Sequence, residues 1–313
     1  MASLKSLVAD GRFCFPFGWD SSLQNEVLET RQAFTRPVIL VRAQSVWDDL
    51  VPQSEALNAA ANAGWWERLT RQLPRVNPPY ECMWLEALTE QGRVGALIQR
   101  IDDGDTVQQL YQVFFPDGDD LNPHTTYFQA KFLQERRDHG DVYAVGVAVA
   151  FLDQGGSSIA GWRVRAIPDE VQKAMDEGGK IRFDLALEMR TGWVFHTLAR
   201  MNCANVKVLP IPGQGHYRGR HQRHRQPELS SVWHEIVITS VPKLRKQQAQ
   251  AAPDGAHTEV RFHWVRGHYA DYSKGAGLFG NPKLKAVFWI PEHRAGNEEL
   301  GTVVPSYTIE GEK

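Results

Sequence analysis

Arg261-Phe-His-Trp-Val-Arg-Gly-His-Tyr-Ala-Asp-Tyr272 is the stretch that decides the C-terminal fold of this 313-residue chain. A second aromatic run, Ala286-Val-Phe-Trp-Ile-Pro-Glu-His-Arg-Ala-Gly296, follows after a loop that contains Gly275, Gly277 and Gly280. Two apolar runs separated by turn-forming residues are typical of paired strands. The sequence therefore predicts a C-terminal β-hairpin, although it leaves the register of the two strands open.

Both runs carry side chains suited to phosphate chemistry, namely Arg266, His268 and Tyr272 in the first run and His293 in the second. Histidine moves protons near neutral pH, and arginine holds an oxyanion by paired hydrogen bonds. Tyrosine stacks on a base or donates a hydrogen bond. The set predicts either a catalytic site or a phosphate- or base-binding site. The same groups could instead satisfy strand ends and turn carbonyls.

One segment, from Gly213 to Pro227, has a clear basic bias. Its charged and aromatic contacts for nucleic acid would be Arg218, Arg220, Arg223, Arg225 and Tyr217. Guanidinium groups meet phosphates through contacts that weaken with salt. The segment predicts a nucleic-acid contact, with a solvated surface loop as the alternative.

Composition sets broad limits on the class of protein. Apolar residues make up 42% and charged residues 23%, as in soluble globular proteins, and the formal net charge is −2. That charge argues against a protein that coats nucleic acid with its whole surface, but it leaves room for a local basic patch. Cys14, Cys82 and Cys203 are widely spaced, which indicates no zinc ribbon or disulfide framework and favours a reducing cytosol. No apolar run suits a signal peptide or a membrane helix, so we expect a cytoplasmic protein without a membrane partner.

Common catalytic motifs are missing from the chain. It contains no GxSxG, no Walker loop and no HExxH, which removes the usual hydrolase, NTPase and metalloprotease classes and leaves enzymatic activity undecided. The acidic turn Asp117-Gly-Asp-Asp fails as a calcium loop because Phe128 stands where a bidentate Glu is required. A second polar cluster matches no ligand spacing and is better explained as a solvated loop; its members are Asp119, Asp120, His124, His139 and Asp141. We therefore expect no metal and no cofactor.

The remaining segments predict an α+β fold with antiparallel sheets and flanking helices. An N-terminal region, residues 1–155, would hold helices and a β-meander, and residues 156–313 would form an α+β region with the hairpin, unless both are one continuous domain. The expected helices are Asp20–Phe34, Val46–Leu73, Pro168 to the Gly178-Gly179 pair, and Gly192–Met201. The expected strands are Val38–Val41, Tyr80–Glu86, Gly95–Ile101, Leu110–Phe115, Tyr143–Leu152, Val206–Ile211 and Ser231–Ser240.

The C-terminal segment resembles a family of uncharacterised proteins from phages, prophages and actinobacteria. These carry Arg-Gly-His-x-x-x-Tyr, then Leu-Phe-Gly, then Phe-Trp-x-x-x-His-x-x-Gly, with a basic run before a strand and an Asn-Cys-x-Asn-Val stretch. The matching residues here are Arg266, Gly267, His268, Tyr272, Leu278, Phe279, Gly280, Phe288, Trp289, His293 and Gly296, together with Arg218–Arg225 and Asn202–Val206. Ala295 stands where an arginine is more usual. The resemblance covers roughly residues 190 to 309 and implies a mobile-element context without supplying a mechanism.

Three hypotheses of function follow from these residues. The first is a phage- or prophage-encoded protein that binds RNA or DNA and acts in regulation or in host–phage conflict. The second is a metal-independent ribonuclease with His268 as acid or base, Arg266 as phosphate clamp and His293 as second proton carrier. The third is a protein-binding inhibitor of a host or phage factor that uses exposed tryptophans and the acidic turn at Asp117–Asp120.

Overall fold

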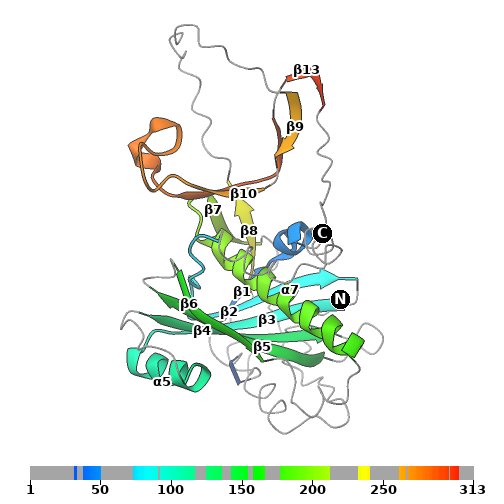
Figure 1. The fold of residues 1–313 in the computed structure, drawn as a ribbon, viewed down its shortest axis with the longest axis vertical. Coiled ribbons are helices and arrows are strands. Elements are labelled where there is room, and N and C mark those ends of the chain that lie inside the picture. The colour runs from blue at the N-terminus through cyan, green and yellow to red at the C-terminus, as the bar shows by residue number, and fades with distance from the viewer. Residues whose placement is uncertain are drawn as a thin grey trace, which may run out of the picture. The chain divides into compact units, whose positions relative to one another are not determined.

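The computed structural model confirms a mixed α and β fold (Figure 1). It describes residues 32–33, 38–50, 73–90, 92–116, 125–135, 142–153, 158–165, 177–211, 232–239, 261–265, 267–295 and 297–302. The chain divides into two compact units. The first contains Met1–Asn202 and Val206–Val237, and the second contains Cys203–Asn205 and Ile238–Lys313. The boundary expected near residue 155 falls between two strands of the first unit.

An eight-stranded sheet forms the centre of the first unit, in the order β6-β5-β4-β3-β2-β1-β8-β7. Strands β2 to β6 pair antiparallel in sequence order, whereas β1 pairs parallel with both β2 and β8. The strands are β1 Ile39–Arg42, β2 Cys82–Thr89, β3 Gly92–Ile101, β4 Thr126–Glu135, β5 Val142–Asp153, β6 Ser158–Arg165, β7 Val206–Pro210 and β8 Trp233–Ile238.

Most of the expected strands of this unit are confirmed. The runs at Gly95–Ile101 and Tyr143–Leu152 lie in β3 and β5, and those at Val38–Val41 and Tyr80–Glu86 overlap β1 and β2. The runs at Val206–Ile211 and Ser231–Ser240 contain β7 and β8. A β-meander is also confirmed, because β2 to β5 are consecutive antiparallel neighbours. The third strand of the meander is β4 and not the expected run Leu110–Phe115.

The strand expected at Leu110–Phe115 is wrong, because this segment belongs to helix α5, Gly104–Phe114. Asp103 caps the helix, and its side chain accepts a hydrogen bond from the Thr106 backbone N–H at 3.2 Å. Hydrogen bonds from the Thr106 hydroxyl and backbone hold the pKa of Asp103 below its ordinary value. Val107, Tyr111 and Phe114 recur at helical spacing, so the apolar residues share one helix face instead of alternating.

Helices α5 and α7 (Glu177–Met201) cover opposite faces of the sheet (Figure 1). On β4, Tyr127 packs in one cluster with Tyr111 and Phe114 of α5, whereas the next residue, Phe128, lies 5.7 Å from Phe195 of α7 between ring centroids. Neighbouring residues of a strand point to opposite faces. The sheet is therefore buried on both sides here, which explains its long apolar strands.

Helix α7 runs through the Gly178-Gly179 pair, so the expectation that a helix ends there is wrong. The two glycines lie in the first turn, where backbone N–H groups need no partner within the helix. Further along, every residue from Arg190 to Arg200 is buried. Tertiary packing on all sides therefore holds this helix, and the expected helix at Gly192–Met201 is confirmed as its C-terminal half.

Polar side chains of α7 are buried together with the apolar ones. The Trp193 indole donates to the Ala43 carbonyl at 3.1 Å, and Arg190 donates to the Gln134 side chain. Arg200, only 2% exposed, forms an ion pair of 2.7 Å with Asp49, which lies on a helix at 44–50. A half-exposed carboxylate thus neutralises a buried guanidinium. Removing that carboxylate would leave the buried charge of Arg200 uncompensated, which would destabilise the fold.

Buried His196 makes the stability of the first unit depend on pH. Burial, reinforced by the Arg200 guanidinium, lowers the pKa of His196 to about 3. In the unfolded chain the pKa of this histidine is near 6.5, so below that pH it binds a proton that the buried imidazole of the native state does not bind. We expect the free energy of unfolding to fall below about pH 6.5 by up to about 1.4 kcal/mol per pH unit. Denaturant unfolding between about pH 7 and pH 5 should show this slope, and His196→Gln should reduce it; an unchanged slope in the variant would contradict the assignment.

Several expected segments lie outside the described residues. The helix at Asp20–Phe34 is described only at residues 32–33, and that at Val46–Leu73 only up to residue 50 and at residue 73. The start of the helix expected from Pro168 and the polar cluster at residues 119–124 and 139–141 also lie outside them. Within the described part of the chain, no helix combines the length and apolar character that a membrane crossing requires.

Candidate functional site

The C-terminal hairpin is confirmed, and one register runs through all of it. Its first half is β9 Arg261–Val265 paired with β12 His293–Ala295, and its second half is β10 His268–Asp271 paired with β11 Val287–Ile290. Val265 stands opposite His293 and His268 opposite Ile290, so the same pairing continues across the interruption between the two halves. A further strand, β13 Asn297–Thr302, runs parallel to β9.

The tip of this hairpin is a compact loop, residues 273–285, which we call the lysine loop. The Tyr272 N–H donates to the Ala286 carbonyl at 3.0 Å, which closes the base of the loop. Inside it, two short 3-10 turns, Leu278–Gly280 and Pro282–Leu284, follow each other, and Leu278 is only 4% exposed. Ends that lie close together and a buried side chain within the loop are features of an Ω-loop, a structure that is frequently functional.

Three exposed lysines give the lysine loop its charge. Lys274 follows the first strand, and Lys283 and Lys285 precede the second. No Asp or Glu occurs between residues 273 and 285. The nearest acid, Asp271, accepts a hydrogen bond from the Ser273 N–H at 2.8 Å, and the Ser273 side chain and backbone hold its pKa below the ordinary value. The loop therefore presents a local positive charge in a chain of net charge −2.

A buried asparagine anchors the strand behind this loop. The Asn205 amide donates to the Trp289 carbonyl at 2.7 Å and accepts from the Trp289 N–H at 2.9 Å. The neighbouring Ala204 N–H donates to the Val287 carbonyl at 2.9 Å, and the Asn205 carbonyl accepts from the Thr239 N–H at 2.7 Å. Residues 204–205 thus extend the hairpin as a second partner of β11, beside β10. The side-chain amide takes the place of a backbone neighbour.

Trp289 also explains the glycine in the interruption of the hairpin. Its ring packs edge-on against Tyr269 with 4.8 Å between centroids, and a Cβ at Gly267 would lie 2.7 Å from its Cζ2 atom. Even a methyl group at position 267 would collide with the indole.

Gly267→Ala should therefore destabilise the second unit by about 1 to 3 kcal/mol, because the indole must move out of a packed site. Trp289→Phe removes the colliding ring atoms, so in that background the alanine should cost less. Chemical denaturation of the two single variants and the double variant measures this coupling. Strictly additive effects would show that the indole does not exclude the side chain.

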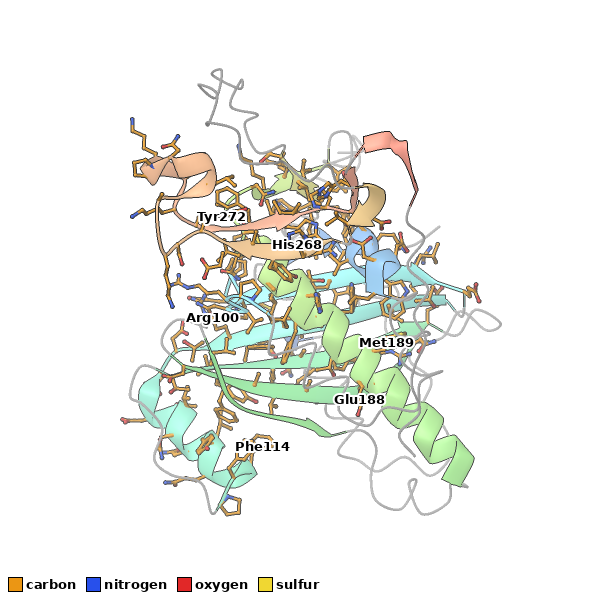
Figure 2. All side chains as sticks on the ribbon, turned by 45° about the horizontal axis from the view of Figure 1, so that its top comes forward. Arg100, Phe114, Glu188, Met189, His268 and Tyr272 are labelled. Atoms are coloured by element: carbon orange, nitrogen blue, oxygen red, sulfur yellow. The ribbon has the colours of Figure 1, made fainter. Side chains whose placement is uncertain are left out.

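His268 and Tyr272 lie at the start and just past the end of β10 (Figure 2). Residues four apart on a strand face the same side. His268 is exposed, and half-buried Tyr272 packs against Phe288 with 6.1 Å between ring centroids. The two side chains therefore lie on the same face of the hairpin.

His293 is exposed, and its ring orientation is set by the chain itself. Its Nδ1 lies 3.0 Å from the Pro291 carbonyl oxygen. Because a carbonyl only accepts hydrogen bonds, Nδ1 carries the proton, and Nε2 of the neutral ring is left as the acceptor. That is the tautomer in which Nε2 can act as a base.

The hairpin register separates the two histidines. His293 is in the row of Val265 and His268 is three residues further along, a separation of about 10 Å along an extended strand. In an unbroken strand an odd offset also turns side chains to opposite faces, although Gly267, which belongs to neither strand, lies between them. The register does not pair His268 with His293.

The other proposed site residues lie outside the described part of the chain. These are Arg266 of the hairpin and the basic-run residues Tyr217, Arg218, Arg220, Arg223 and Arg225. Among the described residues, no group of three His, Cys, Asp or Glu side chains lies close enough to hold a metal ion.

Tryptophan exposure bears on the hypothesis of a protein-binding surface. Trp47, Trp84, Trp193 and Trp289 are buried, and Trp233 is half-buried. No tryptophan whose burial is described is therefore an exposed anchor. The acidic turn at 117–120 lies outside the described residues.

Sequence reasoning passed over two features of this site. The three lysines could have been found, because a 13-residue loop with three Lys and no acid is visible as a charge pattern. The role of Asn205 could not, because no local rule predicts that an amide 84 positions away will bond to Trp289.

Comparison of the chain with protein-family models, with curated proteins and with solved structures found no match. The function must therefore be argued from the site.

Proposed function

We propose that this protein binds nucleic acid through its C-terminal hairpin and the basic run Arg218–Arg225. The observation that carries the proposal is the lysine loop, with Lys274, Lys283 and Lys285 exposed on a closed loop that has no acidic residue. Cationic side chains bind phosphates by releasing condensed counterions, which drives most non-specific nucleic-acid affinity.

Two further features support nucleic acid over a small anion. The charge comes from both arms of the loop, with Lys274 after the first strand and Lys283 and Lys285 before the second. His268 and Tyr272 stand on the strand that leads into the loop, and both side chains can hydrogen-bond or stack with bases. The resemblance to phage and prophage proteins would place such binding in regulation or in host–phage conflict.

Fluorescence anisotropy with labelled RNA and DNA, single- and double-stranded, tests this function at low and moderate salt. We expect binding at low salt that weakens steeply as salt rises. Replacement of Arg218, Arg220, Arg223 and Arg225 by Gln should weaken binding further. A protein with no salt-sensitive affinity for any of these probes would end the proposal.

A metal-independent ribonuclease is the second candidate, and the orientation of His293 favours it. With Nδ1 held by the Pro291 carbonyl, Nε2 is available to accept a proton from a ribose hydroxyl. Because His268 lies three rows away, the two imidazoles would serve different atoms of an extended RNA. Cleavage of RNA that persists in EDTA and is lost in His293→Ala or His268→Ala would support this activity. Full activity in both variants would contradict it.

A further inference from the structure

We infer that the lysine loop binds the phosphate backbone of nucleic acid and does not read base sequence, an inference that rests on the proposed function. The first argument is the chemistry of the exposed side chains. Bases are distinguished mainly by paired contacts from Arg, Lys, Asn and Gln and by acidic side chains. Between residues 273 and 285 the chain has no Arg, Gln, Asp or Glu, and a single Asn.

That one amide is already used inside the loop. The Asn281 side-chain oxygen accepts a hydrogen bond from the Lys283 N–H at 3.0 Å, which caps the second 3-10 turn. Turning this oxygen toward a base would uncap the turn that carries Lys283. With its oxygen engaged, this amide cannot make the paired contact by which Asn reads adenine.

The lysines themselves favour phosphate. A lysine ammonium is a compact point charge on a flexible stem and lacks the fixed fork by which arginine recognises guanine. Exposed lysines contact phosphates without regard to the neighbouring base. Since Lys274, Lys283 and Lys285 are all exposed, each of them can reach a phosphate from solvent.

This assignment has a quantitative consequence. Each phosphate neutralised on duplex DNA contributes about −0.9 to the slope of log affinity against log salt concentration. Three lysines together should contribute about −2.7, and each should contribute its share whatever the sequence of the duplex. Contacts made by the basic run would add to the total slope but would not change the difference caused by a loop variant.

The experiment measures this slope for full-length protein with Lys274→Gln, Lys283→Gln and Lys285→Gln, singly and combined. The probes are labelled duplexes of about 20 base pairs with unrelated sequences, and matching single strands, for which the slope per phosphate is about −0.7. Lys207→Gln is the matched control, because Lys207 is an exposed lysine on β7 outside the loop. Thermal unfolding verifies that each variant is folded.

We expect each loop variant to make the slope shallower by about 0.9 on every duplex, the triple variant by about 2.7, and Lys207→Gln to change nothing. A loss of affinity in a loop variant that differs more than about tenfold among unrelated duplexes would overturn the inference while leaving nucleic-acid binding intact. A triple variant with the wild-type slope would also overturn it and assign binding to the basic run. An equal loss in the Lys207→Gln control would overturn it by showing that the slope does not depend on the loop. Absence of binding by the wild-type protein would overturn the proposed function itself.

Discussion

Asn205→Ala is expected to lower the free energy of unfolding of the second unit by about 2 to 6 kcal/mol. The substitution leaves both the N–H and the carbonyl of Trp289 without the amide that bonds them. Asn205 is 5% exposed and Trp289 6%, so water cannot readily take its place. Each buried polar group left unsatisfied costs about 1 to 3 kcal/mol. Chemical denaturation followed by tryptophan fluorescence measures the loss.

The chain supplies a matched control for this prediction. Gln44 brackets Leu88 in the same way, accepting from its N–H at 2.6 Å and donating to its carbonyl at 3.0 Å. Leu88 is 60% exposed, so water can replace the amide. Gln44→Ala should therefore cost no more than about 1 kcal/mol. Equal losses of unfolding free energy in the two variants would show that burial does not determine what these paired amide hydrogen bonds contribute to stability.

Gly277→Ala is expected to be nearly as damaging, at about 2 to 6 kcal/mol, and to abolish the shape of the lysine loop. Gly277 has φ +84°, a conformation that L side chains rarely adopt. A Cβ there would also overlap the Asn281 carbonyl oxygen and lie 2.8 Å from its carbon. Because these are backbone atoms, no rotamer change can relieve the collision. Hydrogen exchange across residues 273–285 should rise along with the loss of stability.

Gly280→Ala separates the cost of the positive φ from the cost of the collision with Asn281. Gly280 also has a positive φ, +71°, but nothing lies within 4 Å of a Cβ at that position. This variant bears only the left-handed conformational cost of about 1 to 2 kcal/mol. If Gly277→Ala proved no worse than Gly280→Ala, the collision with Asn281 would not be real.

The sequence predicted well where the pattern was local. The Val- and Ala-rich run Tyr143–Leu152 and the aromatic runs around the C-terminal glycines predicted strands that the structure contains. It failed at Leu110–Phe115, where a short apolar run satisfies both periods and the cap at Asp103, seven residues upstream, decides in favour of a helix. It also failed at Gly178-Gly179, because these glycines lie in the first turn of α7 and begin a helix instead of ending one.

The candidate site was predictable in composition but not in geometry. His268, Tyr272 and His293 could be selected by residue type alone. The three-row separation of the histidines depends on strand register, which turn chemistry and packing decide. The proton arrangement of His293 depends on a carbonyl two residues away, a detail that only coordinates supply.

The second unit includes Cys203–Asn205, although the residues before and after this short segment belong to the first unit. No single cut can release it whole, and a fragment starting at Ile238 would lack the amide that bonds Trp289. Recombination between genes would meet the same obstacle. The two halves of this protein are therefore expected to be exchanged, lost or inherited together.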